Sequence, residues 1–177
     1  MSKKRRVFVG YELSDMLKQK VVKWQELHDY LPVRWTPRDN LHVTLVPPWY
    51  TEDVEDVITL LRSMKQSVEP FSVLFESLTI GPEDRRPWLL WARGQIPEAF
   101  LLLRAQLIYL LQRQDEKRTP VLHTTIARFD KKKFERFPDK NFSEAIQWEE
   151  KITSFSLIES HLRRTGAVYE TLVKVEL

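Results

Sequence analysis

The sequence predicts an α+β fold with two mainly antiparallel sheets that line a central cleft and carry helices on their outer faces. Segments that alternate between apolar and polar residues, as strands do, interleave with stretches of helical apolar spacing. Several strand-like segments are separated only by short turns, which favours antiparallel pairing. Two of them carry the same tripeptide, His-x-Thr, which indicates two similar lobes. We expect residues 1–177 to form one bilobal domain, a length sufficient for a substantial core.

The first half of the chain predicts three long strands and two helices. The strands are rich in alternating Val, Phe, Leu and Tyr, while the helices repeat apolar residues every three or four positions. Ser14 and Thr51 are the expected helix N-caps. In order, we expect a strand at 6–12, a helix from Ser14 to about Tyr30 ended by Pro32, an extended piece at 33–36, a turn at 37–40, a strand at 41–46 closed by Pro47-Pro48, a helix from Thr51 to about Ser67, and a strand at 71–80.

The second half predicts a further helix and a C-terminal hairpin. Pro97 suits the start of a strongly apolar helix, and the sequence "RRTG" suits a turn between two alternating segments. In order, we expect a strand at 88–93, a helix from Pro97 to about Gln112, a charged loop at 114–120, a strand at 122–127, a loop at 130–140, a short helix at 142–148, and a hairpin of strands at 152–162 and 167–175.

The composition excludes several classes of protein. No apolar run approaches the ~20 residues that cross a membrane, and the basic N-terminus lacks the apolar core of a signal peptide. The absence of cysteine removes disulfides and thiolate chemistry, and only four glycines leave no Gly-rich phosphate loop. We therefore expect a cytoplasmic protein that has no membrane contact. The net charge of +3 gives a mild preference for anionic partners.

The two His-x-Thr segments carry the chemistry that the sequence predicts. His42 and Thr44 lie in "NLHVTLVPPW", and His123 and Thr125 lie in "VLHTTIARF". Because side chains two residues apart in a strand point to the same face, each strand offers an imidazole beside a hydroxyl. If the two strands lie next to each other, they line a cleft with two histidines and two threonines.

This set of side chains suits phosphoryl chemistry without a metal. One neutral imidazole can accept a proton and a second, protonated imidazole can donate one near neutral pH. The threonine hydroxyls can bind phosphate oxygens, and Arg128 can add charge-assisted hydrogen bonds. Strict alternation puts Arg128 on the face opposite His123, so it needs a bulge or the end of the strand to turn inward. The sequence shows no pattern typical of a metal site, and we expect no cofactor.

Taken alone, each segment has an ordinary structural explanation. A single histidine in a strand is more often a satisfied core or edge residue, and threonine is common in strands. The paired tripeptides, however, each lie in an apolar strand and together use half of the four histidines. The pair therefore favours a shared site.

Several segments resemble the 2H phosphoesterase superfamily, in particular its RNA 2′,3′-cyclic phosphodiesterases, historically called 2′-5′ RNA ligases (LigT-like). "LHVTL" and "LHTTIAR" are similar to the paired H-x-T-x motifs of that family. The resemblance extends over essentially the whole chain, through "RVFVGYEL", "VRWTPRDN", "PFSVLFESLTIGPEDRRPWLLWA" and "FSLIESHLRRTGAVYETLVKVEL".

The resemblance implies a bilobal fold and a metal-independent opening of a 2′,3′-cyclic phosphate, on RNA ends or nucleotides, to a 2′-phosphomonoester. His42 and His123 correspond to the catalytic pair, with His123 as the base that activates water and His42 as the acid, although the symmetry of the pair permits the exchange. Thr44 and Thr125 correspond to the phosphate ligands. Arg128 matches the arginine that often closes the second motif.

The resemblance leaves two other functions open. The same chemistry with a ribose hydroxyl in place of water is reversible 2′-5′ RNA ligation, which we rank second because water is more abundant. A nucleotide- or RNA-binding module without turnover is the third, and the intact histidine pair argues against it. "VPPWYTED" follows the first motif where relatives usually have a "KFLGE"-like stretch, so the substrate beyond the phosphate can differ. We expect a monomer.

Other residues have both a functional and a structural interpretation. Trp49 and Tyr50 could stack on a base, and Arg34 and Trp35 could flank a phosphate, but packing is the better expectation for all four. The run "KKKFERF" at 131–137 could hold an RNA backbone, although a solvated basic loop is the simpler interpretation.

Overall fold

The computed structural model describes residues 4–65, 68–83, 86–114, 119–164 and 166–177. Ser67 at the expected end of the second helix, part of the charged loop at 114–120, and Thr165 in the expected hairpin turn lie outside these residues. Within the described ranges the chain has the predicted α+β fold, with antiparallel pairing between all neighbouring strands of the sheet.

The strands form one continuous sheet in the order β7-β4-β5-β6-β3-β1-β8-β9, and the short β2 pairs with β6 outside this path. The strands are β1 Arg5–Glu12, β2 Arg34–Trp35, β3 His42–Thr51, β4 Phe71–Gly81, β5 Leu89–Gly94, β6 Leu122–Arg128, β7 Ser143–Ile152, β8 Ser154–Arg163 and β9 Gly166–Glu176. The helices are α1 Asp15–Leu27, the 3-10 turn η1 Arg38–Asn40, α2 Val54–Arg62, α3 Glu98–Leu110 and α4 Lys131–Glu135.

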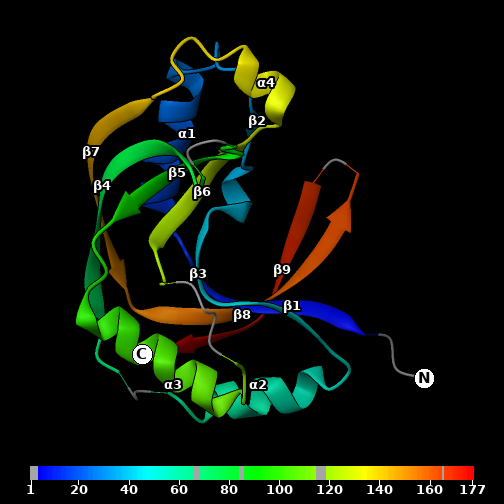
Figure 1. Cartoon of the computed structure of the whole chain (residues 1–177). Helices are drawn as coiled ribbons and strands as arrows, with labels where there is room; N and C mark the ends of the chain where they lie inside the picture. The colour runs from blue at the N-terminus through cyan, green and yellow to red at the C-terminus, as the bar shows by residue number, and fades with distance from the viewer. Residues whose placement is uncertain (1–3, 66–67, 84–85, 115–118, 165) are drawn as a thin grey trace.

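The two expected sheets are joined at one point. Between β3 and β6 a single residue pair, Val43 with Thr124, connects the half made of β7, β4, β5 and β6 to the half made of β3, β1, β8 and β9. We call these the β6 half and the β3 half. In Figure 1 the β6 half stands above and the β3 half runs across below it. Each half therefore contributes one His-x-Thr strand, and these two strands are neighbours.

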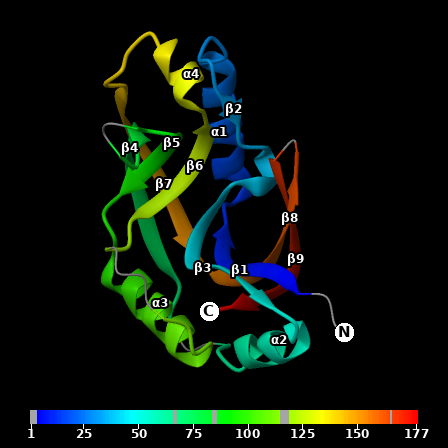
Figure 2. The ribbon, with the colours of Figure 1, turned by 45° about the vertical axis from the view of Figure 1, so that its right-hand side comes forward.

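Helices cover the outer face of each half. In Figures 1 and 2, α2 and α3 lie below the β3 half, while α1 stands beside the strands of the β6 half. Their apolar residues join the sheet in one core, which includes the fully buried Phe75, Phe100, Leu107 and Phe155. Over the described ranges, the helices are all too short or too polar to cross a membrane.

A buried carboxylate ties the two halves together. Glu150 on β7 accepts hydrogen bonds from the Tyr11 hydroxyl (2.8 Å) and from the backbone N–H (3.0 Å) and hydroxyl (2.9 Å) of Ser14. Ser14 is also the predicted N-cap of α1, because its Oγ accepts a hydrogen bond from the Leu17 N–H. Burial raises the pKa of Tyr11, so its hydroxyl stays protonated and remains a donor. These bonds fix β1 and α1 against the opposite edge of the sheet.

The expected short helix at 142–148 was wrong. This segment begins β7, and its alternation places Ile146, Trp148 and Ile152 in the core. Conversely, the expected loop at 130–140 contains α4, whose N-cap Asp130 accepts a hydrogen bond from the Lys133 N–H. Pairing with β4 in the sheet overrides the local preference in the first case, and a side-chain cap stabilises one helical turn in the second.

Two boundaries also differ from the prediction. β3 continues through Pro47 and Pro48, because the pairing of β1 with β3 is irregular at this point and needs no proline N–H. Helix α2 takes Asp53 as its N-cap residue, while the Thr51 hydroxyl accepts a hydrogen bond from the Asp53 N–H just before it.

One buried hydroxyl at the junction of the halves offers a test of the packing. The Thr124 side chain is fully buried, and in the described part of the chain its Oγ1 has no hydrogen-bond partner. Because an unsatisfied buried hydroxyl costs about 1–3 kcal/mol, Thr124→Val should raise the free energy of unfolding by about 1 kcal/mol in urea titrations. Thr79→Val is the matched control and should lower it, since Thr79 Oγ1 accepts a hydrogen bond from Trp91 Nε1 (3.1 Å). A loss of stability in Thr124→Val would contradict this packing.

Candidate active site

The two His-x-Thr segments meet where β3 pairs with β6. The antiparallel pairing of Val43 with Thr124 places His42 beside Thr125 and Thr44 beside His123. All four polar side chains are partly exposed, while Leu41, Val43, Leu122 and Thr124 between them are buried. Alternation along the two strands thus gathers two imidazoles and two hydroxyls on one face of the sheet.

Both imidazoles are held in the same tautomer. The His42 Nδ1 lies 2.7 Å from the carbonyl oxygen of Asn40, and the His123 Nδ1 lies 3.0 Å from that of Val121. Since a carbonyl oxygen can only accept, each Nδ1 carries the proton when the ring is neutral. Each Nε2 is then left with a lone pair that can take up a proton.

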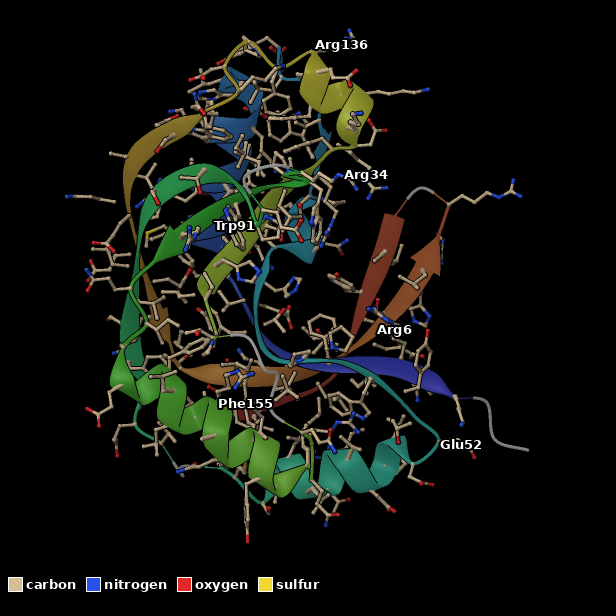
Figure 3. All side chains as sticks on the ribbon, viewed as in Figure 1. Arg6, Arg34, Glu52, Trp91, Arg136 and Phe155 are labelled. Carbon is tan, nitrogen blue, oxygen red and sulfur yellow. The ribbon has the colours of Figure 1, made fainter. Side chains whose placement is uncertain are left out.

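Aromatic side chains fix the orientation of both rings. The His42 ring packs against Phe8 (4.9 Å between centroids) and Tyr169 (5.1 Å), which also contact each other (5.1 Å). The His123 ring packs edge-on against Trp91 (5.0 Å), and Figure 3 shows Trp91 among the strands of the β6 half. Tyr169 comes from the C-terminal hairpin, which Asn40 holds in place by donating from Nδ2 to the Ala167 carbonyl oxygen (2.7 Å).

The surroundings favour the neutral form of both histidines. Burial lowers the pKa of His42 to about 4, and the nearby His123 and Arg128 act in the same direction. Burial also lowers the pKa of His123, assisted by the positive charges of Arg128 and Arg93. Both rings are therefore neutral at pH 7 when no anion is bound, and an anion between them would raise both pKa values.

A bulge in β6 turns Arg128 toward this site. Leu90 of β5 pairs with Ala127, whereas the next residue, Trp91, pairs with Thr125, so Ile126 is the extra residue. Beyond the bulge, Arg128 falls on the same face as Thr125. The inward turn that the sequence required is therefore present.

A residue of helix α1 that the sequence analysis missed stabilises the bulge by hydrogen bonding. Gln25 of α1 is buried, and its Nε2 donates to the carbonyl oxygens of Ile126 and Thr36, both at 3.1 Å. The Ile126 oxygen also accepts from the Thr36 N–H (2.9 Å). Gln25 thus connects α1, the bulge and the segment after β2. A polar residue beside an apolar helix stripe was the only signal available in the sequence.

A pocket of about 100 Å³ lies beside His42, Thr125 and Arg128, and its lining does not include His123 or Thr44. Arg34 pairs with Arg128 across β2 and β6, so two guanidinium groups meet at one side, and Figure 3 shows Arg34 below α4. The pocket is lined by His42 and Thr125 together with Arg34, Arg128, Asn40 and Tyr169, and further by Trp35, Thr36, Pro37, Gly166 and Ala167. Among the polar lining residues, Arg34, Thr36, Asn40 and Tyr169 were not predicted as site residues.

Of the other aromatic residues considered as ligand contacts, two pack against neighbouring side chains and one is exposed to solvent. Trp49 is buried, with the Arg113 guanidinium over its ring, and Trp35 packs edge-on against Trp24. Tyr50 remains 62% exposed. Within the described residues, the potential metal-binding group is Glu159, His161 and Glu170, whose ligand atoms lie within 4.8 Å of one another, and it includes neither His42 nor His123.

Comparison with known proteins identifies the family of the chain. Residues 13–164 match the family model of the 2′-5′ RNA ligase superfamily. A protein of Methanocaldococcus jannaschii named RNA 2′,3′-cyclic phosphodiesterase is 22% identical over 178 residues, which cover 94% of this chain and 98% of the relative.

Two solved structures share the fold. The protein TT0787 of Thermus thermophilus has a TM-score of 0.78 at 21% identity, with 97% of both chains covered. LigT of E. coli, in complex with 3′-AMP, has a TM-score of 0.76 at 19% identity, with 99% of both chains covered. From the family match over most of its length, the chain belongs to the 2′-5′ RNA ligase superfamily.

Proposed function

We propose that the protein hydrolyses the 2′,3′-cyclic phosphate of RNA ends or nucleotides to a 2′-phosphomonoester, without a metal or cofactor. The observation that carries the proposal is the register of β3 and β6, which puts two imidazoles of the same tautomer and two hydroxyls on one face beside Arg128. The substrate class is supported by the M. jannaschii relative and by E. coli LigT, whose structures include complexes with 3′-AMP and ATP.

In this reaction the two imidazoles act on opposite sides of one phosphorus atom. His123 Nε2 takes a proton from water as the water oxygen bonds to phosphorus. The bond from phosphorus to the 3′ oxygen breaks, and protonated His42 Nε2 supplies that oxygen with a proton. Thr44, Thr125 and Arg128 bind the non-bridging oxygens, where negative charge is held during the displacement.

Because its pKa is low, His42 can act as the acid only if it gains a proton when the substrate binds. In the empty pocket His42 is neutral, so the proposed assignment depends on the phosphate anion raising its pKa. Exchange of the two roles is the alternative, and a substrate whose leaving group needs no proton distinguishes them.

Ligation remains the second candidate: a ribose 5′-hydroxyl of another RNA end attacks phosphorus in place of water, and the bond to the 3′ oxygen breaks to leave a 2′-5′ linkage. It would require a second strand end near His123 and the exclusion of water from the pocket. A module that binds without turnover is the third.

We also propose that residues 1–177 act as one bilobal domain, as a monomer in the cytoplasm.

Removal of either histidine should abolish turnover. His42→Ala and His123→Ala should each lower kcat by at least ~100-fold on an oligoribonucleotide ending in 2′,3′-cyclic phosphate, with EDTA present. The product of the unaltered protein should be the 2′-phosphate, identified by chromatography against 2′- and 3′-phosphate standards. His161→Ala is the control and should retain activity, because His161 lies on the hairpin and bonds to Glu170.

A second substrate shows which histidine acts as the acid and which acts as the base. With sulfur in place of the 3′ oxygen, the leaving group needs no proton, so His42→Ala should recover activity and His123→Ala should not. Recovery by His123→Ala instead would exchange the roles. Turnover that persists in both variants, or that depends on the absence of EDTA, would contradict the two-histidine mechanism.

The pH profile should report the lowered pKa values. Since burial and nearby cations disfavour the imidazolium form, the free enzyme loses its protonated acid below about pH 6.5, the ordinary pKa of histidine, and kcat/KM should already decline as pH rises toward that value. Arg128→Gln removes a cation that lowers both pKa values, so the alkaline limb should move to higher pH while the maximum falls about tenfold or more. Arg62→Gln on α2 is the control of equal charge change. An alkaline limb that does not move in Arg128→Gln would contradict this electrostatic coupling.

A further inference from the structure

Two surface hollows continue the catalytic pocket outward. The first, of about 360 Å³, shares Arg34 and Arg128 with the pocket and adds Trp88 and Lys133. The second, of about 780 Å³, shares Trp88 with the first and reaches α4 and the residues just before β5. We call this surface the Trp88 ledge and define it by Arg34, Arg86, Trp88, Lys131, Lys133 and Lys140.

The ledge carries a strong excess of positive charge. Among the described residues that line the two hollows, six are lysine or arginine and two are acidic, Asp130 and Glu135. A larger groove of about 1000 Å³ lies between the start of β1, the segment before α2, and β8. Its described lining has four lysines or arginines against five carboxylates and shares no residue with the catalytic pocket. A polyanion that leaves the pocket is therefore attracted to the ledge and not to the groove.

The ledge also presents an aromatic platform. The Trp88 side chain is 44% exposed, although large aromatic side chains are usually buried, and the Arg128 guanidinium lies 5.4 Å from its ring centroid. An exposed indole beside cations is the arrangement on which the bases of single-stranded nucleic acids stack.

Lys131 and Lys133 of the ledge lie on α4, which is held in place by aromatic packing. Phe129, Phe134 and Phe137 pack on one another with centroids 4.7–5.8 Å apart and anchor α4 to the end of β6. Lys140 Nζ donates to the carbonyl oxygens of Phe134 and Phe137 and closes the turn after α4. Lys133 is therefore held near the pocket by a packed helix and not by a loose loop.

We propose that the RNA strand leading to the cyclic phosphate lies along the Trp88 ledge, with a base stacked on Trp88 and backbone phosphates near Lys133 and Arg34. This rests on the proposed function for the position of the terminal phosphate. It makes an oligoribonucleotide, and not a cyclic mononucleotide, the better substrate.

The test compares two substrates and measures binding separately. Kinetics are recorded for adenosine 2′,3′-cyclic phosphate and for a hexaribonucleotide with the same end, and binding of a fluorescent hexamer is followed by anisotropy in the His42→Ala, His123→Ala background. Trp88→Ala and Lys133→Glu should each raise KM and Kd for the hexamer about tenfold, and Trp88→Phe should restore most of the loss. Lys133→Glu should also flatten the dependence of log Kd on log salt by about 0.7. Arg62→Glu, which reverses an exposed charge on α2, is the matched control.

The outcomes separate the ledge from the chemistry. If the cyclic mononucleotide stays within about twofold in Trp88→Ala and Lys133→Glu while the hexamer weakens, the ledge is supported. Equal losses on both substrates would show that the variants act through Arg128 and would contradict the proposed role of the ledge. Hexamer binding that changes only as much as in Arg62→Glu would contradict it as well. If the unaltered protein turns over neither substrate, the proposed function fails, while the anisotropy still decides the ledge.

Discussion

The pairing of Val43 with Thr124 is the contact on which the rest of the site depends. It is the single residue pair through which the described parts of β3 and β6 join the two halves of the sheet, and its register sets which side chains share a face. A shift of one residue would turn one histidine and its threonine into the core. The hydrophobic burial of the neighbouring Leu41, Leu122 and Ile126 therefore stabilises this register. Because side chains alternate along a strand, the same register places the polar residues of the site on the opposite face of the sheet.

The electrostatics of the site follow from the same packing. The strands partly bury both imidazoles, and the bulge at Ile126 adds the positive charge of Arg128 beside them, so both pKa values are lowered. In the proposed complex a phosphate would raise both pKa values again, because its negative charge stabilises the imidazolium form. In the proposed mechanism, substrate binding thus supplies the protonation state that catalysis needs. Gln25 takes part indirectly, since it bonds to the carbonyl oxygen of the bulge that positions Arg128.

The sequence predicted the parts of the fold that alternation and caps determine. The strands with His42 and His123, the faces of their side chains, the Ser14 cap and the C-terminal hairpin were all recovered, because each rests on a local pattern. The start of β7 was not, since its helix-compatible residues are ordered by pairing with β4, far away in the chain. Arg34 and Tyr169 reach the pocket through β2 and the β9 hairpin, and no local pattern indicates such tertiary positions. For Arg128 the sequence showed that a bulge was needed, but only pairing with β5 locates it.

The central claim is that both imidazoles flank one phosphate. The most direct measurement is nitrogen-15 NMR of the labelled histidine rings while adenosine 2′-phosphate is added, over a range of pH. The account predicts that the ring nitrogens of His42 and His123 shift together at one ligand concentration, with both pKa values raised. Addition of the ligand should leave the signals of His28, which stacks on Trp24 at the end of α1, as they are without it. A response from only one of His42 and His123, or from neither, would contradict the account.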